Sequence, residues 1–161
     1  MRGLAAAILL AWSAAAFAAQ PFADVHVHFN WDQRELIDAA SIAAKLEAAG
    51  VEFAVAAGTP SELALELARA AGGRVIPLFS PYIHELGRRD WHLDPQVAIR
   101  AEAGLSAGDY LGIGEIHFMA GFAPRADNRV FAQLMALAGK YRVPVLIHID
   151  SGNETAFLVW R

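Results

Sequence analysis

The stretch Phe22-Ala-Asp-Val-His-Val-His-Phe29 sets the interpretation of the whole chain. It is short, apolar and rich in valine, which is typical of a β-strand. Side chains two residues apart in a strand lie on the same face, so His26 and His28 are expected to project together. Because histidine is the commonest metal ligand in proteins, the stretch predicts a strand that presents two imidazoles to one divalent ion. The alternative is a pair of histidines that are simply hydrogen-bonded at a strand end.

The residues before this stretch have the pattern of a secretory signal peptide. Arg2 supplies a positive charge, residues 4–17 form an apolar run, and Ala16-Phe17-Ala18 has the small-x-small form of a cleavage site. The run is shorter than the roughly 20 apolar residues that span a bilayer, although an uncleaved anchor is the alternative. We therefore expect residues 1–18 to be a signal peptide and the protein to be exported, with the periplasm as its destination. No stable membrane span is expected after cleavage.

The composition excludes several classes of site. The 161 residues include 13 Lys and Arg against 17 Asp and Glu, a net charge of −4, and no cysteine. An acidic chain without a basic stripe argues against a nucleic-acid partner, because affinity for phosphate backbones depends on Lys and Arg. The absence of cysteine excludes disulfides and thiolate metal sites. Without residues 1–18, 143 residues remain, which is enough for one domain with its own core.

Strand-like and helix-like segments alternate along the rest of the chain. Five strand-then-helix repeats predict an α/β fold with parallel strands. The expected strands are nearly continuous apolar runs, as found where helices cover a sheet or a barrel encloses one face. The expected strands cover 22–29, 51–57, 74–79, 110–118 and 143–149, and the expected helices cover 36–49, 59–71, a segment from 94, 128–141 and a segment from 152.

Further polar residues lie near the ends of the later strands. Glu115 and His117 share one face of the fourth expected strand, and His148 lies near the end of the fifth. The carboxyl ends of parallel strands are where the sites of such folds lie. His26, His28 and His148 together with the Glu115 carboxylate form a nitrogen and oxygen ligand set for zinc or a related ion. Such an ion activates water for hydrolysis, and Glu115 would bind one ion or bridge two.

These residues resemble the amidohydrolase superfamily of metal-dependent hydrolases. The similarity rests on Asp24-Val-His-Val-His28, Gly112-Ile-Gly-Glu-Ile-His117 and Pro144-Val-Leu-Ile-His148, in this order. The glutamate of the fourth strand is most similar to the TatD-like branch. The resemblance implies a (β/α)8 TIM-type barrel and a divalent metal cofactor, zinc first of all, as one or two ions. The implied metal ligands are His26, His28, Glu115 and His148.

The resemblance covers the N-terminal portion of such a barrel. The family places a further histidine at strand six and a proton-handling aspartate at strand eight, and a whole barrel takes about 250 residues. Residues 19–161 are therefore expected to form a partial barrel of about five βα units. No catalytic residue is assigned, although His117 is a candidate, and activity of this chain alone stays open. A homo-oligomer is one way to cover the open barrel edge.

The predicted function is hydrolysis of a small-molecule ester, lactone, amide or phosphoester by metal-activated water. A nuclease role is disfavoured by the acidic composition and the expected export. The alternatives are a non-catalytic incomplete barrel that binds metal or a partner, and a metal-dependent decarboxylase of the same superfamily. The residues expected to line a substrate pocket, with loop packing as the alternative for the aromatic ones, are His117, Phe118, Tyr82 and Trp91.

Overall fold

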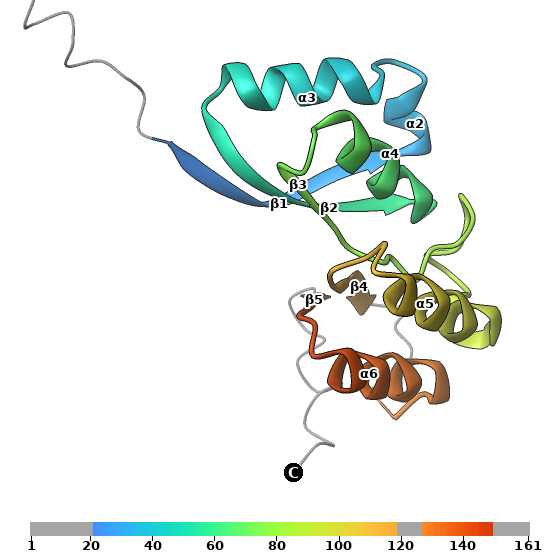
Figure 1. The fold of residues 1–161 in the computed structure, drawn as a ribbon. Helices are drawn as coiled ribbons and strands as arrows, with labels where there is room; N and C mark the ends of the chain where they lie inside the picture. The colour runs from blue at the N-terminus through green and yellow to red at the C-terminus, as the bar shows by residue number, and fades with distance from the viewer. Residues whose placement is uncertain (1–20, 119–126, 150–161) are drawn as a thin grey trace, which may run out of the picture.

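The structure is a computed structural model that describes residues 21–118 and 127–149 (Figure 1). The predicted signal peptide over 1–18 and the predicted helix from residue 152 lie outside the described residues. Of the helices in the described ranges, none combines the length and apolarity needed to cross a bilayer.

The strands are parallel and follow one another in chain order. The first three form one sheet and the last two form another, and a parallel bridge between Phe79 and Ile113 joins the segment after β3 to β4. With helices between the strands, this is the arrangement of a partial (β/α)8 barrel, so the predicted fold class is confirmed. The strands are β1 (Phe22–Asn30), β2 (Val51–Thr59), β3 (Val75–Pro77), β4 (Ile113–Phe118) and β5 (Val145–Ile149).

Each group of strands has its own helices beside it (Figure 1). Helices α3 and α4 pack on the first sheet, and α5 and α6 pack against each other beside β4 and β5. They are α2 (Trp31–Arg34), α3 (Ala39–Ala48), α4 (Glu62–Ala70), the 3₁₀ helix η2 (Trp91–Leu93), α5 (Gln96–Ala107) and α6 (Arg129–Tyr141).

Side-chain caps set where two of the helices begin. Asp38 accepts a hydrogen bond from the backbone N–H of Ser41, 2.7 Å away, so α3 begins at Ala39 and not at residue 36 as the apolar pattern predicts. Leu36, outside the helix, is 89% exposed. Asn128 caps α6 in the same way, close to the predicted start. The short helix α2 was not predicted, because four residues are too few to show a helical period.

The core consists of two apolar clusters, one for each group of strands. Phe29 and Leu67 are fully buried between the first sheet and its helices. Ile113 and Ile116 of β4 and Leu134 of α6 are fully buried in the second cluster. Every residue of β4 is buried, so this strand is held from both sides and its polar residues are fixed in place.

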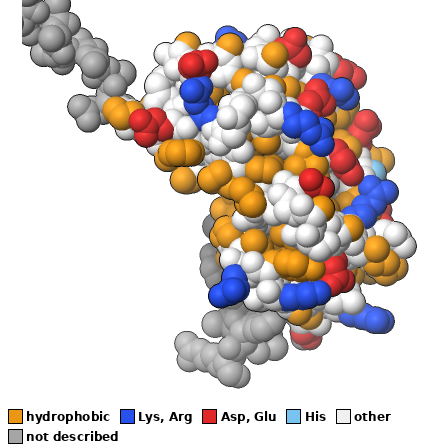
Figure 2. Space-filling view, viewed as in Figure 1, with side chains coloured by type: hydrophobic (Ala, Val, Ile, Leu, Met, Phe, Trp, Pro, Cys, Tyr) orange, Lys and Arg blue, Asp and Glu red, His pale blue; other side chains and the backbone are white. Residues whose placement is uncertain are grey.

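The first sheet leaves apolar side chains exposed. Phe22, Val25 and Phe53 are 50%, 66% and 54% exposed, and hydrophobic side chains gather on the side of the molecule that carries β1 and β2 (Figure 2). Within the described ranges, β1 pairs with β2 alone, so its other edge has no strand partner there. These three residues are called the β1–β2 apolar patch below.

Candidate metal centre

The strand β1 presents its two histidines together, as its sequence predicts. The rings of His26 and His28 meet edge to face with their centroids 4.8 Å apart, and their Nε2 atoms are 3.1 Å apart. The pairing of β1 with β2 shifts register between Asp24 and Val27. The Asp24 carboxylate accepts a hydrogen bond from the backbone N–H of His26 in this irregular stretch, which ties down the strand just before the pair.

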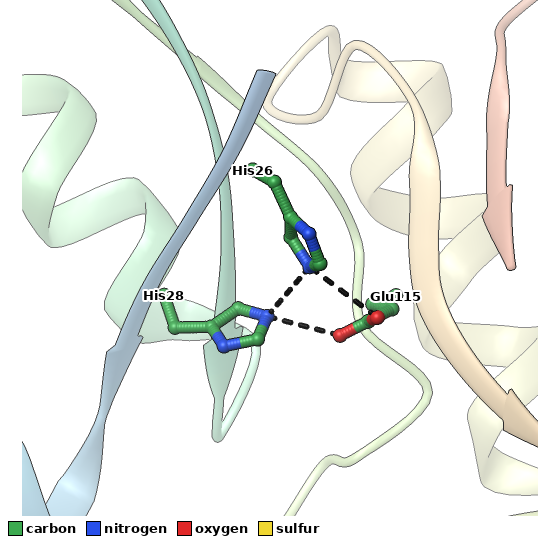
Figure 3. Close-up of side chains that lie close together, drawn as sticks. All are labelled: His26, His28 and Glu115. Carbon is green, nitrogen blue, oxygen red and sulfur yellow. Dashed lines mark hydrogen bonds and ion pairs between the residues drawn. The ribbon is translucent and has the colours of Figure 1, made fainter. Parts of the chain in front are cut away.

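Both rings point to Glu115. Figure 3 shows the two imidazoles, from β1, directed at the carboxylate from β4. The Nε2 atom of His28 lies 2.9 Å from Oε2, and that of His26 lies 3.3 Å from Oε1. The fold therefore brings together residues that are 87 positions apart in the chain.

The strand β5 adds a third histidine to the same carboxylate. His148 Nδ1 lies 2.9 Å from Glu115 Oε1. His117 is in register with His148 across the β4–β5 pairing, and their rings stack with centroids 4.6 Å apart. His117 Nε2 lies 3.4 Å from Glu115 Oε2. Four histidines from three strands thus surround one carboxylate.

Glu115 is the buried centre of this cluster. Its side chain is 4% exposed, whereas those of His26, His28 and His148 are 47%, 33% and 40% exposed. Burial alone raises the pKa of the carboxyl, but the hydrogen bond from His28, the charge that His117 carries in acid and the hydrogen bonds from His26 and His148 outweigh it. The pKa of Glu115 is lowered well below its usual range, so the group is ionised.

Gly114 allows β4 and β5 to approach closely beside the carboxylate. Its φ is +138°, and an added Cβ would lie 2.5 Å from the carbonyl oxygen of Leu146. A side chain at this position would force the two strands apart and strain the backbone. The glycine before Glu115 thus has a packing role that places Glu115 and His148 side by side.

Tyr82 contacts the far side of His117. Its hydroxyl is 2.6 Å from His117 Nδ1 and accepts a hydrogen bond of 2.8 Å from the backbone N–H of His117. Burial lowers the pKa of His117 to about 4, against the opposing charge of Glu115. Burial also raises the pKa of Tyr82. Near neutral pH, the imidazole and the phenol are therefore both uncharged.

The residues predicted to line a substrate pocket separate into two groups. Tyr82 and His117 border a small cavity next to His28 and Glu115. Trp91 and Phe118 are 1% and 0% exposed and pack edge to face within the core. Neither of them is among the residues that line the small cavity.

Arg88 also borders the small cavity, and no pattern in the sequence pointed to it. Its guanidinium lies 5.8 Å from the centroid of the Tyr82 ring. It follows β3 in an irregular connection without periodic pattern, so only the folded chain identifies it as a neighbour of the site.

The donors present fit a divalent ion. Two sets of three residues, His26 with His28 and Glu115, and Glu115 with His117 and His148, each have ligand atoms within 4.8 Å of one another. Imidazole nitrogen with carboxylate oxygen suits zinc and related ions. Glu115 belongs to both sets: its Oε2 atom lies closest to His28, and its Oε1 atom lies closest to His148.

A protein-family model covers most of the chain. The model described as "TatD related DNase" matches residues 23–159. The chain belongs to the TatD family. TatD proteins are metal-dependent hydrolases with a TIM-barrel fold, which confirms the predicted superfamily and branch. Neither the curated proteins nor the solved structures yielded a match.

The TatD description bears on one further prediction. It names a DNase, which runs weakly against the expectation of no nucleic-acid partner. It describes what the family acts on, and the substrate of this chain is a separate matter.

Proposed function

We propose that this TatD protein is a metal-dependent hydrolase in which His26, His28, Glu115 and His148 hold one or two divalent ions, zinc first of all. The observation that carries the proposal is the convergence of histidines from β1 and β5 on one buried carboxylate of β4. A buried carboxylate requires compensating partners. The histidines lie at the carboxyl ends of their strands and are partly exposed, so an ion can reach them from solvent.

The residues prepare the site for a cation. When bound, a divalent ion polarises the scissile bond and activates water. Glu115 supplies the negative charge, because its carboxyl stays ionised over the whole working range of pH. The N–H groups of the ligand histidines that satisfy the carboxylate in the metal-free chain must be displaced by the ion. Metal binding is therefore expected to release protons and to weaken as the pH falls.

The substrate class is the less specified part of the proposal. An ester, lactone, amide or phosphoester is compatible with metal-activated water, and the DNase in the family description makes a phosphoester the first to test. We place the protein in the periplasm, on the basis of the signal-peptide pattern of residues 1–18.

The test combines metal binding with a substrate panel. The chain is stripped with EDTA and titrated with Zn²⁺ or Mn²⁺ by calorimetry. It is then assayed on a phosphodiester, a single-stranded oligonucleotide, an aryl ester and a lactone. We expect stoichiometric metal uptake and metal-dependent turnover of at least one substrate.

The matched variants are the double substitution His26→Ala/His28→Ala and the control His84→Ala. His84 is a half-exposed histidine that pairs with Asp90 and belongs to neither donor set. The double variant should lose metal uptake and turnover, and the control should keep both. Equal metal uptake by all three proteins would overturn the proposal.

The β1–β2 apolar patch favours a second candidate, in which the chain binds a partner through this surface without catalysis. The two candidates are separated by the same panel. Metal uptake without turnover, together with concentration-dependent association in light scattering, supports the binding role.

A further inference from the structure

The second histidine of β4 lies between a metal-ligand candidate and a buried tyrosine. His117 is 8% exposed and Tyr82 is 2% exposed. The hydroxyl of Tyr82 meets both the backbone N–H and the Nδ1 atom of His117, and the opposite ring nitrogen faces Glu115. Tyr82 lies 35 residues earlier, in a long connection. The sequence predicts it as a pocket residue, and only the fold places it against His117.

The hydrogen-bond directions follow from the donors present. The backbone N–H of His117 can only donate, so the Tyr82 oxygen accepts it. Among the described residues, the hydroxyl has no other hydrogen-bond partner than His117. If Nδ1 also donated to the oxygen, the hydroxyl proton would be buried without an acceptor, which costs free energy. The hydroxyl therefore donates to Nδ1.

An Nδ1 atom that accepts a hydrogen bond carries no proton, so the proton of the neutral ring resides on Nε2. That N–H lies on the side of Glu115, with Nε2 at 3.4 Å from Oε2. In this state Nε2 has no free lone pair, so its N–H faces the carboxylate and the ring is not available as a metal ligand.

We propose that Tyr82 is a positioning residue that holds His117 in its Nε2–H form, so that His117 turns an N–H towards Glu115 and stays out of the metal's ligand set. Arg88, over the Tyr82 ring, helps hold that ring in place. The consequence for metal binding rests on the proposed metal function. The protonation pattern itself is a property of the metal-free chain.

The decisive measurement is nitrogen-15 NMR of the chain labelled at histidine, in the metal-free state near neutral pH. The chemical shift of each ring nitrogen reports whether it carries the proton. We expect His117 to show a protonated Nε2 and an unprotonated Nδ1. A protonated Nδ1 would overturn the proposal, and this result requires no variant to fold and no metal to bind.

Tyr82→Phe removes the hydroxyl and keeps the ring. We expect the His117 signals to move towards a mixture of the two neutral forms, and zinc affinity to fall by about 10- to 100-fold, the usual cost of losing a group that orients a metal ligand. The control is Tyr110→Phe, which removes the hydroxyl of another buried tyrosine and should leave both readouts unchanged. An unaltered protonation pattern in Tyr82→Phe would contradict the role.

Two substitutions of His117 distinguish a residue that faces Glu115 from a residue that coordinates the metal. The side chain introduced by His117→Gln offers an amide N–H near the position of Nε2, whereas that of His117→Asn offers Tyr82 an acceptor near Nδ1 and has no donor for Glu115. We expect His117→Gln to keep zinc affinity within a few-fold and His117→Asn to lose about 10- to 100-fold. Equal and larger losses in both would identify His117 as a ligand. Absence of zinc binding in the wild type would refute the proposed function while leaving the NMR result to stand.

Discussion

His28 Nε2 and Glu115 Oε2 lie 2.9 Å apart, although 87 residues separate them in the chain. The contact joins β1 to β4, which are not neighbours in either sheet. It is shorter than the contact of His26 with the same carboxylate. The candidate metal centre of this TatD protein therefore depends on the curvature of the strand series, which brings the side chains of β1 and β4 together.

Replacement of Glu115 by glutamine tests the centre of the cluster. Glu115→Gln keeps the shape of the side chain and removes its charge, so zinc affinity should fall by more than the roughly 10- to 100-fold lost with a supporting group. Calorimetric titration measures the change. Glu102→Gln, which alters an exposed glutamate paired with Lys140, is the control and should bind zinc as the wild type does.

Zinc should stabilise the folded chain. A ligand that binds only the native state at about 100 times its Kd raises the free energy of unfolding by about 2.7 kcal/mol. Thermal denaturation should show a higher Tm with zinc, and EDTA should reverse it. In His26→Ala/His28→Ala the Tm should be the same with and without zinc; a persistent rise would place the ion elsewhere.

Acid should destabilise the metal-free chain through His117. Its pKa is about 4 in the folded chain and has an ordinary value of 6.5. Between these values the unfolded chain binds more protons, so the free energy of unfolding falls as the pH decreases, by at most about 3 kcal/mol. The lowered pKa of Glu115 acts in the same direction below its ordinary value of 4.5. Urea denaturation at a series of pH values measures this change. The free energy of unfolding should decrease less steeply with falling pH in His117→Gln than in the wild type.

Substitution of Gly114 should disturb the contact of β4 with β5. Gly114→Ala adds a Cβ against the backbone of Leu146 at a φ that favours glycine, and we expect a loss of about 1–3 kcal/mol or more. Gly139→Ala is the comparison, because a Cβ there meets nothing within 4 Å inside α6. It should stabilise the chain by about 0.5–1 kcal/mol. Equal effects of the two substitutions in urea denaturation would contradict the close approach.

The β1–β2 apolar patch should promote association. Val25→Lys and Phe53→Lys place charges on exposed apolar positions, and we expect them to lower the apparent mass in light scattering at high protein concentration. Leu36→Lys, at an exposed position outside the patch, is the control. If all of these proteins and the wild type are monomeric, the patch is not a contact between copies of this chain.

The sequence by itself determined the order of strands and helices and the pairing of His26 with His28. These follow from local rules, because the alternation of side chains in a strand and the spacing of apolar residues in a helix depend on near neighbours. The predicted first residue of a helix was less accurate where a side-chain cap sets it, as Asp38 does for α3. The family could also be predicted from the sequence, because the motifs that identify the family are short and contiguous.

Only the tertiary structure decided which groups meet. It placed Glu115 within reach of histidines from two other strands, set Tyr82 against His117 and buried Trp91 in the core. These relationships depend on how the strands curve and on which faces the helices cover, and such long-range packing leaves no periodic signal in the sequence. The identity of the candidate donors is therefore a property of the sequence, whereas their convergence on Glu115 is a property of the fold.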